Sequence, residues 1–279
     1  MFTSLPSPSA GSLEIGPLRF NAYGLMIALG VVAAVWLFKK RLAQRQIGKP
    51  DDAGSIAMIA VPFGIVGARA YHVLTDWERF SGRWFDVVKI WHGGLGVWGG
   101  ISVGVVVGVF AAKKRNIPIA AGLTCVAPAL ALAQSIGRWG NWFNQELFGR
   151  PTDLPWALQI SAAKAQASGF VAGTTFHPTF LYESLGCLLI CVALIKAEKR
   201  WQYRDGTLFA MYVAAYTFLR FFVESLRIDE AKNIAGLRLN QWTSIIVFVF
   251  AIGYLSATRN KSKNSEIEAV SQDFRGSQD

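Results

Sequence analysis

Ionisable side chains recur along one apolar stretch of the chain, at Tyr216, Arg220, Glu224 and Arg227. Intervals of four, four and three residues place side chains on one face of an α-helix. An arginine within an apolar helix costs roughly 2.5–3.5 kcal/mol on insertion scales, so it indicates a special role. Arg220 and Glu224 either form an internal ion pair that ties the helical bundle together, or Glu224 orients Arg220 toward a polar cavity. The guanidinium fork matches phosphate oxygens, so the second interpretation predicts a phosphate-bearing ligand.

A second polar group follows another apolar stretch, in "SIGRWGNWFNQELFGRP" (residues 135–151). Arg138, Asn141 and Asn144 repeat every three residues there and would face one way on a helix. Glu146 follows shortly after them. The alternative is a hydrogen-bonded turn that ends the apolar stretch. Both interpretations place a second arginine at the end of a span.

The composition is that of an integral membrane protein. Hydrophobic residues make up 52% of the 279 positions and charged residues 16%, against about 25% charged in soluble domains. The net charge of +10 agrees with basic loops on one side of a membrane. No basic segment is combined with the aromatic platform that nucleic-acid binding needs, so no nucleic-acid partner is expected.

Seven segments are apolar and long enough to cross a bilayer, and the absence of short alternating strands argues against a barrel. The predicted spans are Phe20–Phe38, Ala53–Leu74, Gly93–Ala112, Ile117–Ile136, Thr179–Ile195, Gly206–Glu224 and Leu239–Ala257. The predicted fold is an all-α polytopic membrane protein of seven transmembrane helices, with a small external cap between spans 4 and 5.

Basic residues set the orientation. The loops that contain "FKKRLAQRQ", "AAKKRN" and "KAEKRW" carry more Lys and Arg than the alternate set, and therefore face the cytoplasm. The N-terminal segment 1–19 is then external, 20–258 form the seven-span domain, and 139–177 form the external cap, with strand character. The polar stretch 259–279 is predicted to be a disordered cytoplasmic tail.

Other groups are open to more than one interpretation. His92 begins "HGGLGVWGG" and serves either as an interfacial residue or as a general base. The same stretch contains Gly94-x-Gly96-x-x-Gly99, but no βαβ unit surrounds it, so close helix packing is favoured over dinucleotide binding. The three cysteines lie in apolar segments without a histidine at zinc-site spacing, and neither a metal nor a cofactor is expected.

On this topology the polar groups gather at the outer ends of several spans. They include Tyr23, Arg69, His92, Arg138, His177, Tyr216 and Arg220. The residues alone thus predict an outward-facing pocket, containing arginines, for an anionic lipid. A transporter would distribute such charges along a path across the membrane, so the one-sided cluster favours an enzyme. A non-catalytic scaffold is the third class of function considered.

The motif "GRWGNWFNQELFG" closely resembles the signature of the bacterial prolipoprotein diacylglyceryl transferases. Further pieces occur in the order of that family: "AYGLM", "GARAYHVLTDW", "HGGLGVWGG", "HPTFLYES" and "YTFLRFFVESLR". The resemblance covers residues 20–258. It implies transfer of a diacylglyceryl group from phosphatidylglycerol to the lipobox cysteine of a preprolipoprotein in the bacterial plasma membrane, with glycerol phosphate as the leaving group.

The resemblance also implies roles for individual residues. The expected catalytic residues are His92, as a base or positioning group, with Tyr23, Arg138, Tyr216 and Arg220. The expected substrate-binding residues are Arg138, Asn141, Asn144, Glu146, Gly149, Arg220, Glu224 and Arg227. One departure stands in "LTCVAPAL", where family members often have an aspartate and this chain has Thr124 and Cys125. Any role of that aspartate is therefore in doubt here.

Overall fold

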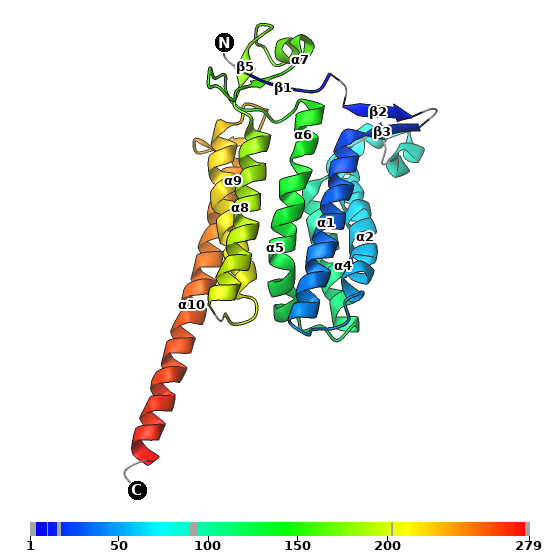
Figure 1. The fold of residues 1–279 in the computed structure, drawn as a ribbon. Helices are drawn as coiled ribbons and strands as arrows, with labels where there is room; N and C mark the ends of the chain where they lie inside the picture. Colours follow the sequence, from blue (N-terminus) through cyan, green and yellow to red (C-terminus); the bar gives the residue numbers. More distant parts are fainter. Residues whose placement is uncertain (1–3, 10, 16–17, 90–93, 202, 277–279) are drawn as a thin grey trace. The chain divides into compact units, whose positions relative to one another are not determined.

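Within the residues that the structure describes, seven helices are long and apolar enough to cross a membrane (Figure 1). The computed structural model describes residues 4–9, 11–15, 18–89, 94–201 and 203–276. The long helices are α1 (Ala22–Gln44), α2 (Asp52–Thr75), α4 (Val97–Lys114), α5 (Ile119–Gly137), α8 (Thr179–Arg200), α9 (Thr207–Leu226) and α10 (Leu239–Gly276). The short helix α6 (Trp139–Asn144) continues the span of α5. The predicted all-α architecture with seven spans is confirmed.

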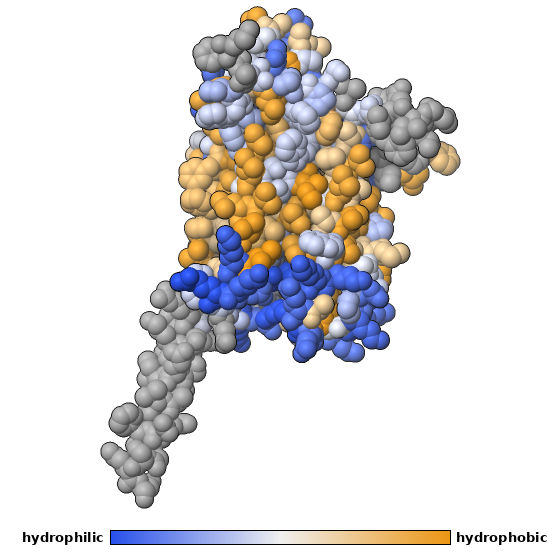
Figure 2. Space-filling view, viewed as in Figure 1, coloured by the Kyte–Doolittle hydropathy of each residue, from blue (hydrophilic) through white to orange (hydrophobic). Residues whose placement is uncertain are grey.

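The surfaces of these helices suit contact with lipid. Large apolar side chains are exposed on several spans, including Val32, Met58, Val106 and Phe250. Figure 2 shows hydrophobic residues over the middle of the helices and hydrophilic residues gathered at their lower ends. Exposed apolar side chains at these positions would be unfavourable in water but are matched to hydrocarbon.

The helix bounds differ from the predicted spans where local chemistry overrides hydropathy. Helix α4 begins at Val97, later than predicted, because Gly94 has a φ of +75° and Gly96 is extended. Helix α1 continues to Gln44 because the basic residues at its end are good helix formers. Apart from α10, which continues to Gly276, the helix ends lie within about six residues of the predicted ones, and the order of the spans is unchanged.

The chain forms two compact units, a larger one of 1–34 and 127–279 and a smaller one of 35–126. In the smaller unit, glycines allow α2 and α4 to pack backbone against backbone. A Cβ added to Gly99 would lie 2.3 Å from the carbonyl oxygen of Gly67, and one on Gly67 would lie 2.5 Å from the Cβ of Val103. The prediction of close helix packing is therefore confirmed for Gly99, whereas Gly94 and Gly96 precede α4.

Arg41 in the smaller unit contacts the backbone at the start of the "LTCVAPAL" segment. Pro128 interrupts α5 and has no N–H to donate to the carbonyl of Thr124 four residues earlier. Arg41, 3% exposed, donates from Nη2 to that carbonyl at 3.1 Å and from Nε to the Cys125 carbonyl at 2.9 Å. A buried arginine therefore satisfies the carbonyl that the proline leaves without its usual helical donor.

In the larger unit, α9 packs against both α8 and α10, and α6 contacts α8. Glycines again permit close approach: a Cβ on Gly30 of α1 would lie 2.9 Å from the Ala133 carbonyl oxygen of α5. Two antiparallel hairpins flank the helices, β2 (Ser12–Ile15) with β3 (Leu18–Asn21), and β6 (Asn233–Ile234) with β7 (Leu237–Arg238).

Residues between α6 and α8 fold into a small sheet with one helix. Strand β4 (Leu158–Gln159) pairs in parallel with β1 (Leu5–Pro6) and antiparallel with β5 (Thr175–Phe176). Helix α7 (Ala162–Ala167) follows β4. The apolar core of this sheet consists of Phe148, Leu158, Ile160, Ala165, Phe176 and Phe180. Strand character is thus present, whereas its external location and the disorder of 259–279 stay predictions.

The helix pair in the smaller unit predicts a test of packing. In Gly67→Ala, the new methyl group would meet Val103 at 2.5 Å and the Gly99 carbonyl at 2.6 Å. Overpacking of this kind destabilises by about 1–3 kcal/mol, which exceeds the helix-propensity gain of about 1 kcal/mol. Thermal unfolding of the purified protein in detergent should therefore occur at a lower temperature than for the wild type.

Gly54→Ala provides the matched control on the same helix. A Cβ at Gly54 meets no atom within 4 Å, so this variant should unfold at or slightly above the wild-type temperature. Equal unfolding temperatures for the two variants would contradict the close-packing interpretation.

Candidate functional site

The carboxylate of Glu183 joins the two arginines that the sequence singled out. Glu183 lies on α8 and is 2% exposed. Its Oε1 is 2.7 Å from Nη2 of Arg138, and its Oε2 is 3.0 Å from Nη1 of Arg220. The Tyr216 hydroxyl donates to Oε1 at 3.1 Å. Three elements that are distant in sequence therefore bring two guanidinium groups and a phenol to one carboxylate.

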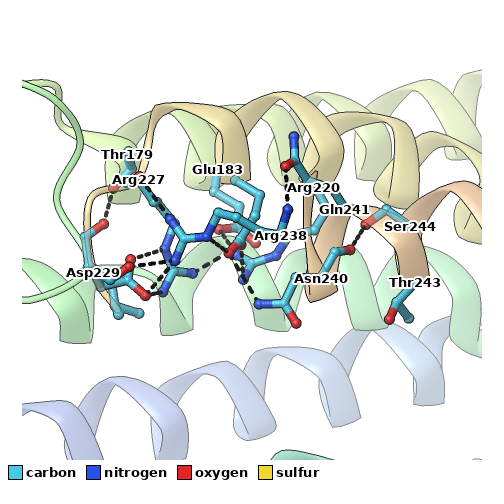
Figure 3. Close-up of polar contacts among 12 residues, drawn as sticks. Thr179, Glu183, Arg220, Arg227, Asp229, Arg238, Asn240, Gln241, Thr243 and Ser244 are labelled. Atoms are coloured by element: carbon cyan, nitrogen blue, oxygen red, sulfur yellow. Dashed lines mark hydrogen bonds and ion pairs between the residues drawn. The ribbon is translucent and has the colours of Figure 1, made fainter. Parts of the chain in front are cut away.

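A second buried carboxylate, Glu224, pairs with the other terminal nitrogen of Arg220. Figure 3 shows Arg220 close to Glu183 and Arg238 within the same polar cluster. Glu224 is fully buried, and its Oε2 lies 2.7 Å from Nη2 of Arg220 one turn earlier on α9. Its Oε1 lies 3.0 Å from Nε of Arg238, and Asn240 Nδ2 donates to the same oxygen at 3.2 Å. The predicted pairing of Arg220 with Glu224 is present, and it belongs to a larger network.

Asp229 connects two further arginines of this network. Its Oδ1 lies 2.7 Å from Nε of Arg227, and its Oδ2 lies 2.9 Å from Nη2 of Arg238. Ala235 and Gly236 have φ angles of +48° and +81°, which make the tight turn that returns Arg238 to the end of α9. Burial alone would raise the pKa of Asp229, but hydrogen bonding and charge from Arg227, with charge from Arg238, lower it below its ordinary value.

The signature segment places its amides and carboxylate together. Asn141 Nδ2 and Asn144 Nδ2 donate to the same oxygen of Glu146, at 3.0 and 3.3 Å. Gln145 ends α6 in a left-handed conformation, with a φ of 52°, so Glu146 turns back toward the helix. Arg138 Nη1 lies 3.5 Å from Asn141 Oδ1. The prediction that Arg138, Asn141 and Asn144 share one side is confirmed.

Two further predicted residues take part through packing. The ring of Tyr23 lies against Gly140, where a Cβ would come within 2.7 Å of the ring. A Cβ on Gly149 would come within 2.8 Å of His177 Cβ, and the Gly149 backbone forms a bridge with Arg227. Gly149 therefore joins the signature segment to the end of α9.

The remaining predicted groups lie elsewhere or outside the described residues. His92 falls within 90–93, which the structure does not describe. Arg69 donates to the carbonyl oxygens of Asp86, Val87 and Gly94, so it holds the backbone on both sides of 90–93. His177 Nδ1 lies 3.1 Å from the Tyr182 hydroxyl.

A cleft of about 580 Å³ lies beside these groups in the larger unit. Glu146 borders it on one side and Asp229 with Glu230 on the other, while Lys164 and Phe170 come from the small sheet-and-helix region. Among the described residues, no group of three or more His, Cys, Asp or Glu side chains could hold a metal ion.

Sequence reasoning gave no role to Glu183, Asp229 or Arg238. Glu183 offered a usable signal, because it is an ionisable residue in an apolar span, as Arg220 is. Its partners lie on other helices, however, so no spacing rule could have paired them. Asp229 and Arg238 are joined by a turn that spacing alone does not predict.

Known proteins resemble this chain over most of its length. Residues 10–257 match the family model described as prolipoprotein diacylglyceryl transferase. Phosphatidylglycerol–prolipoprotein diacylglyceryl transferase 1 of Streptomyces coelicolor is 47% identical over 277 residues, 98% of this chain and 79% of that protein. The proteins named phosphatidylglycerol–prolipoprotein diacylglyceryl transferase in Streptomyces griseus and Frankia alni are each 48% identical, over 90% and 93% of this chain and 76% and 68% of their own lengths.

The lowered pKa of Asp229 predicts an acid-dependent loss of stability. An acid whose pKa is depressed by folding stabilises the folded state above its unfolded value, and the effect disappears as pH falls through the folded value. Asp229→Asn should therefore lower the unfolding temperature at neutral pH. The difference from wild type should shrink as the pH falls below 3.8, the ordinary value for this group.

Asp153→Asn, at an exposed aspartate, is the matched control and should differ little from wild type across the same pH range. A gap between Asp229→Asn and wild type that stays constant down to low pH would refute the role assigned to this pairing.

Proposed function

The chain belongs to the prolipoprotein diacylglyceryl transferase family, and we propose that its buried arginines bind the phosphate of phosphatidylglycerol during transfer. It is a membrane enzyme that transfers the diacylglyceryl group of phosphatidylglycerol to a prolipoprotein cysteine, an early step of lipoprotein maturation. The observation that carries the phosphate assignment is that Arg138 and Arg220, from different spans, meet at one carboxylate.

The proposed step is a displacement at a glycerol carbon. The cysteine sulfur attacks the carbon that carries the phosphate, the C–S bond forms, and the C–O bond breaks. The bonding electrons stay on the phosphate, which leaves as glycerol phosphate with more negative charge than the diester had. Arg138 and Arg220 stabilise that developing charge, as fixed donors do in sites that exclude water.

The thiol must lose its proton, because its unperturbed pKa is about 8.5 and the thiolate is the nucleophile. We assign this proton to His92, whose unperturbed pKa of about 6.5 suits a base near neutral pH. Tyr216, bonded to Glu183, and Tyr23, packed on Gly140, orient the lipid head group or the thiol.

The remaining family-matched residues shape the pocket around the head group. The amides of Asn141 and Asn144, which share Glu146, are assigned to hold the signature segment in place. Gly149 and Arg227 are assigned to keep the end of α9 against that segment. In this scheme Glu224 keeps Arg220 directed toward the phosphate.

The proposed setting is the bacterial plasma membrane. The charge of the basic loops favours an N-terminus outside and a C-terminus in the cytoplasm. The sheet-and-helix region of 139–177 then lies outside, beside the arginines. The second substrate is a preprolipoprotein signal peptide with a lipobox cysteine, presented at that membrane surface.

Removing either arginine tests the assignment. Arg138→Ala and Arg220→Ala should each lower turnover by about 10²–10³-fold, the usual loss for a donor that stabilises developing charge. The assay mixes purified protein, phosphatidylglycerol and a lipobox peptide, and mass spectrometry detects a diacylglyceryl adduct on the peptide cysteine.

Arg150→Ala removes an exposed arginine from the same region and should keep wild-type activity. Folding of each variant is checked by thermal unfolding. Wild-type turnover in both Arg138→Ala and Arg220→Ala would eliminate the phosphate assignment. A folded wild type that binds phosphatidylglycerol without forming an adduct would favour lipid transport instead.

A further inference from the structure

We infer that Glu183 is a positioning residue that sets the distance between Arg138 and Arg220 so that both can engage one phosphate. The inference rests on the proposed phosphate assignment. Each oxygen of the Glu183 carboxylate pairs with a different guanidinium group, at 2.7 Å and 3.0 Å. Carboxylate and phosphate present oxygens that the guanidinium fork recognises in the same way. The separation of two guanidinium groups that share one carboxylate therefore also suits two oxygens of one phosphate.

The contacts of the two arginines are unequal, which gives Glu183 a specific task. Arg220 is held a second time by Glu224, at 2.7 Å. The other contacts of the Arg138 guanidinium group within the described residues, to the Asn141 amide oxygen and the Tyr216 hydroxyl, are both 3.5 Å long. Glu183 is thus the short, charged contact that fixes Arg138 relative to Arg220.

Tyr216 depends on the same carboxylate. Its hydroxyl donates to Glu183 Oε1, the oxygen that also pairs with Arg138. One side chain therefore positions three of the residues assigned to the reaction. A displacement of about 1 Å in such groups can lower turnover by about 10²-fold, even where substrate binding persists.

Neighbouring contacts already join α8 to α5 and α6 without Glu183. Ser184 donates to the Ser135 carbonyl at 2.8 Å, and Trp139 Nε1 donates to the Ser184 hydroxyl at 3.1 Å. These hydrogen bonds hold α8 in place without the Glu183 carboxylate. Glu183 is consequently available to position the arginines, and its loss should affect chemistry more than assembly.

Two substitutions separate positioning from stability. In Glu183→Gln, the amide oxygen can accept a hydrogen bond from one of the two arginines. The amide NH2 group faces the second arginine and cannot accept from it. Both arginines remain to bind the ground-state phosphate, so KM for phosphatidylglycerol should change by less than about threefold while kcat falls about 10–100-fold. Glu183→Asp keeps the charge with one methylene fewer and should recover part of the lost kcat.

Glu198→Gln on α8 is the control for losing a carboxylate from this helix. It lies fifteen residues further on, about 22 Å away along the helix axis, and it should keep wild-type kcat and KM. All four proteins are assayed with phosphatidylglycerol and the lipobox peptide, after thermal unfolding shows that each is folded.

Wild-type kcat in folded Glu183→Gln would overturn the inference and leave the proposed function intact. An inactive wild type would instead refute the proposed function itself. Equal losses of kcat in Glu183→Gln and Glu198→Gln would show a general effect of charge removal and also overturn the inference. Where Glu183→Gln does not fold, Glu183→Asp decides, and an unchanged kcat in that variant overturns the positioning role.

Discussion

The guanidinium groups of Arg138 and Arg220 lie within apolar spans, where a charge costs roughly 2.5–3.5 kcal/mol on insertion scales. Pairing with the buried carboxylates of Glu183 and Glu224 offsets that penalty. The same ion pairs require α8 to lie beside α9 and beside the start of α6, because Glu183 of α8 contacts both Arg220 and Arg138. Glu224 also ties the end of α9 to Arg238, just before α10, and to Asn240 in α10, since both contact the Glu224 oxygen that Arg220 does not.

Much of this arrangement could be predicted from the sequence, because two strong regularities apply. Hydropathy over about twenty residues identifies a span whatever its neighbours are, and the seven spans follow from it. Helical spacing places side chains of one helix on one face, which correctly paired Arg220 with Glu224 and grouped Arg138 with Asn141. The long signature around Arg138 then identified the family, which hydropathy and spacing alone do not do.

Contacts between different helices could not be predicted, because hydropathy and helical spacing act only within one segment. Glu183 meets Arg138 only because α8 packs beside α6, and that neighbourhood depends on the whole bundle. Arg238 reaches Glu224 only because Ala235, unusual for a non-glycine residue, adopts a positive φ in a tight turn. The start of α4 was misplaced for the same kind of reason, since Gly94 leaves the helical region in a stretch that hydropathy treats as continuous.

The contact of Arg41 with α5 has a consequence for biosynthesis. Helix α5 contains Pro128, which has no N–H for the Thr124 carbonyl, and a buried backbone carbonyl without its helical donor loses free energy comparable to a hydrogen bond. The donor comes from α1, which precedes α5 in the chain and leaves the ribosome first. By the time α5 enters the bilayer, the guanidinium group that it requires is already at the membrane. Because α1 is synthesised before α5, the donor for the Thr124 carbonyl is already present when the proline-containing helix is made.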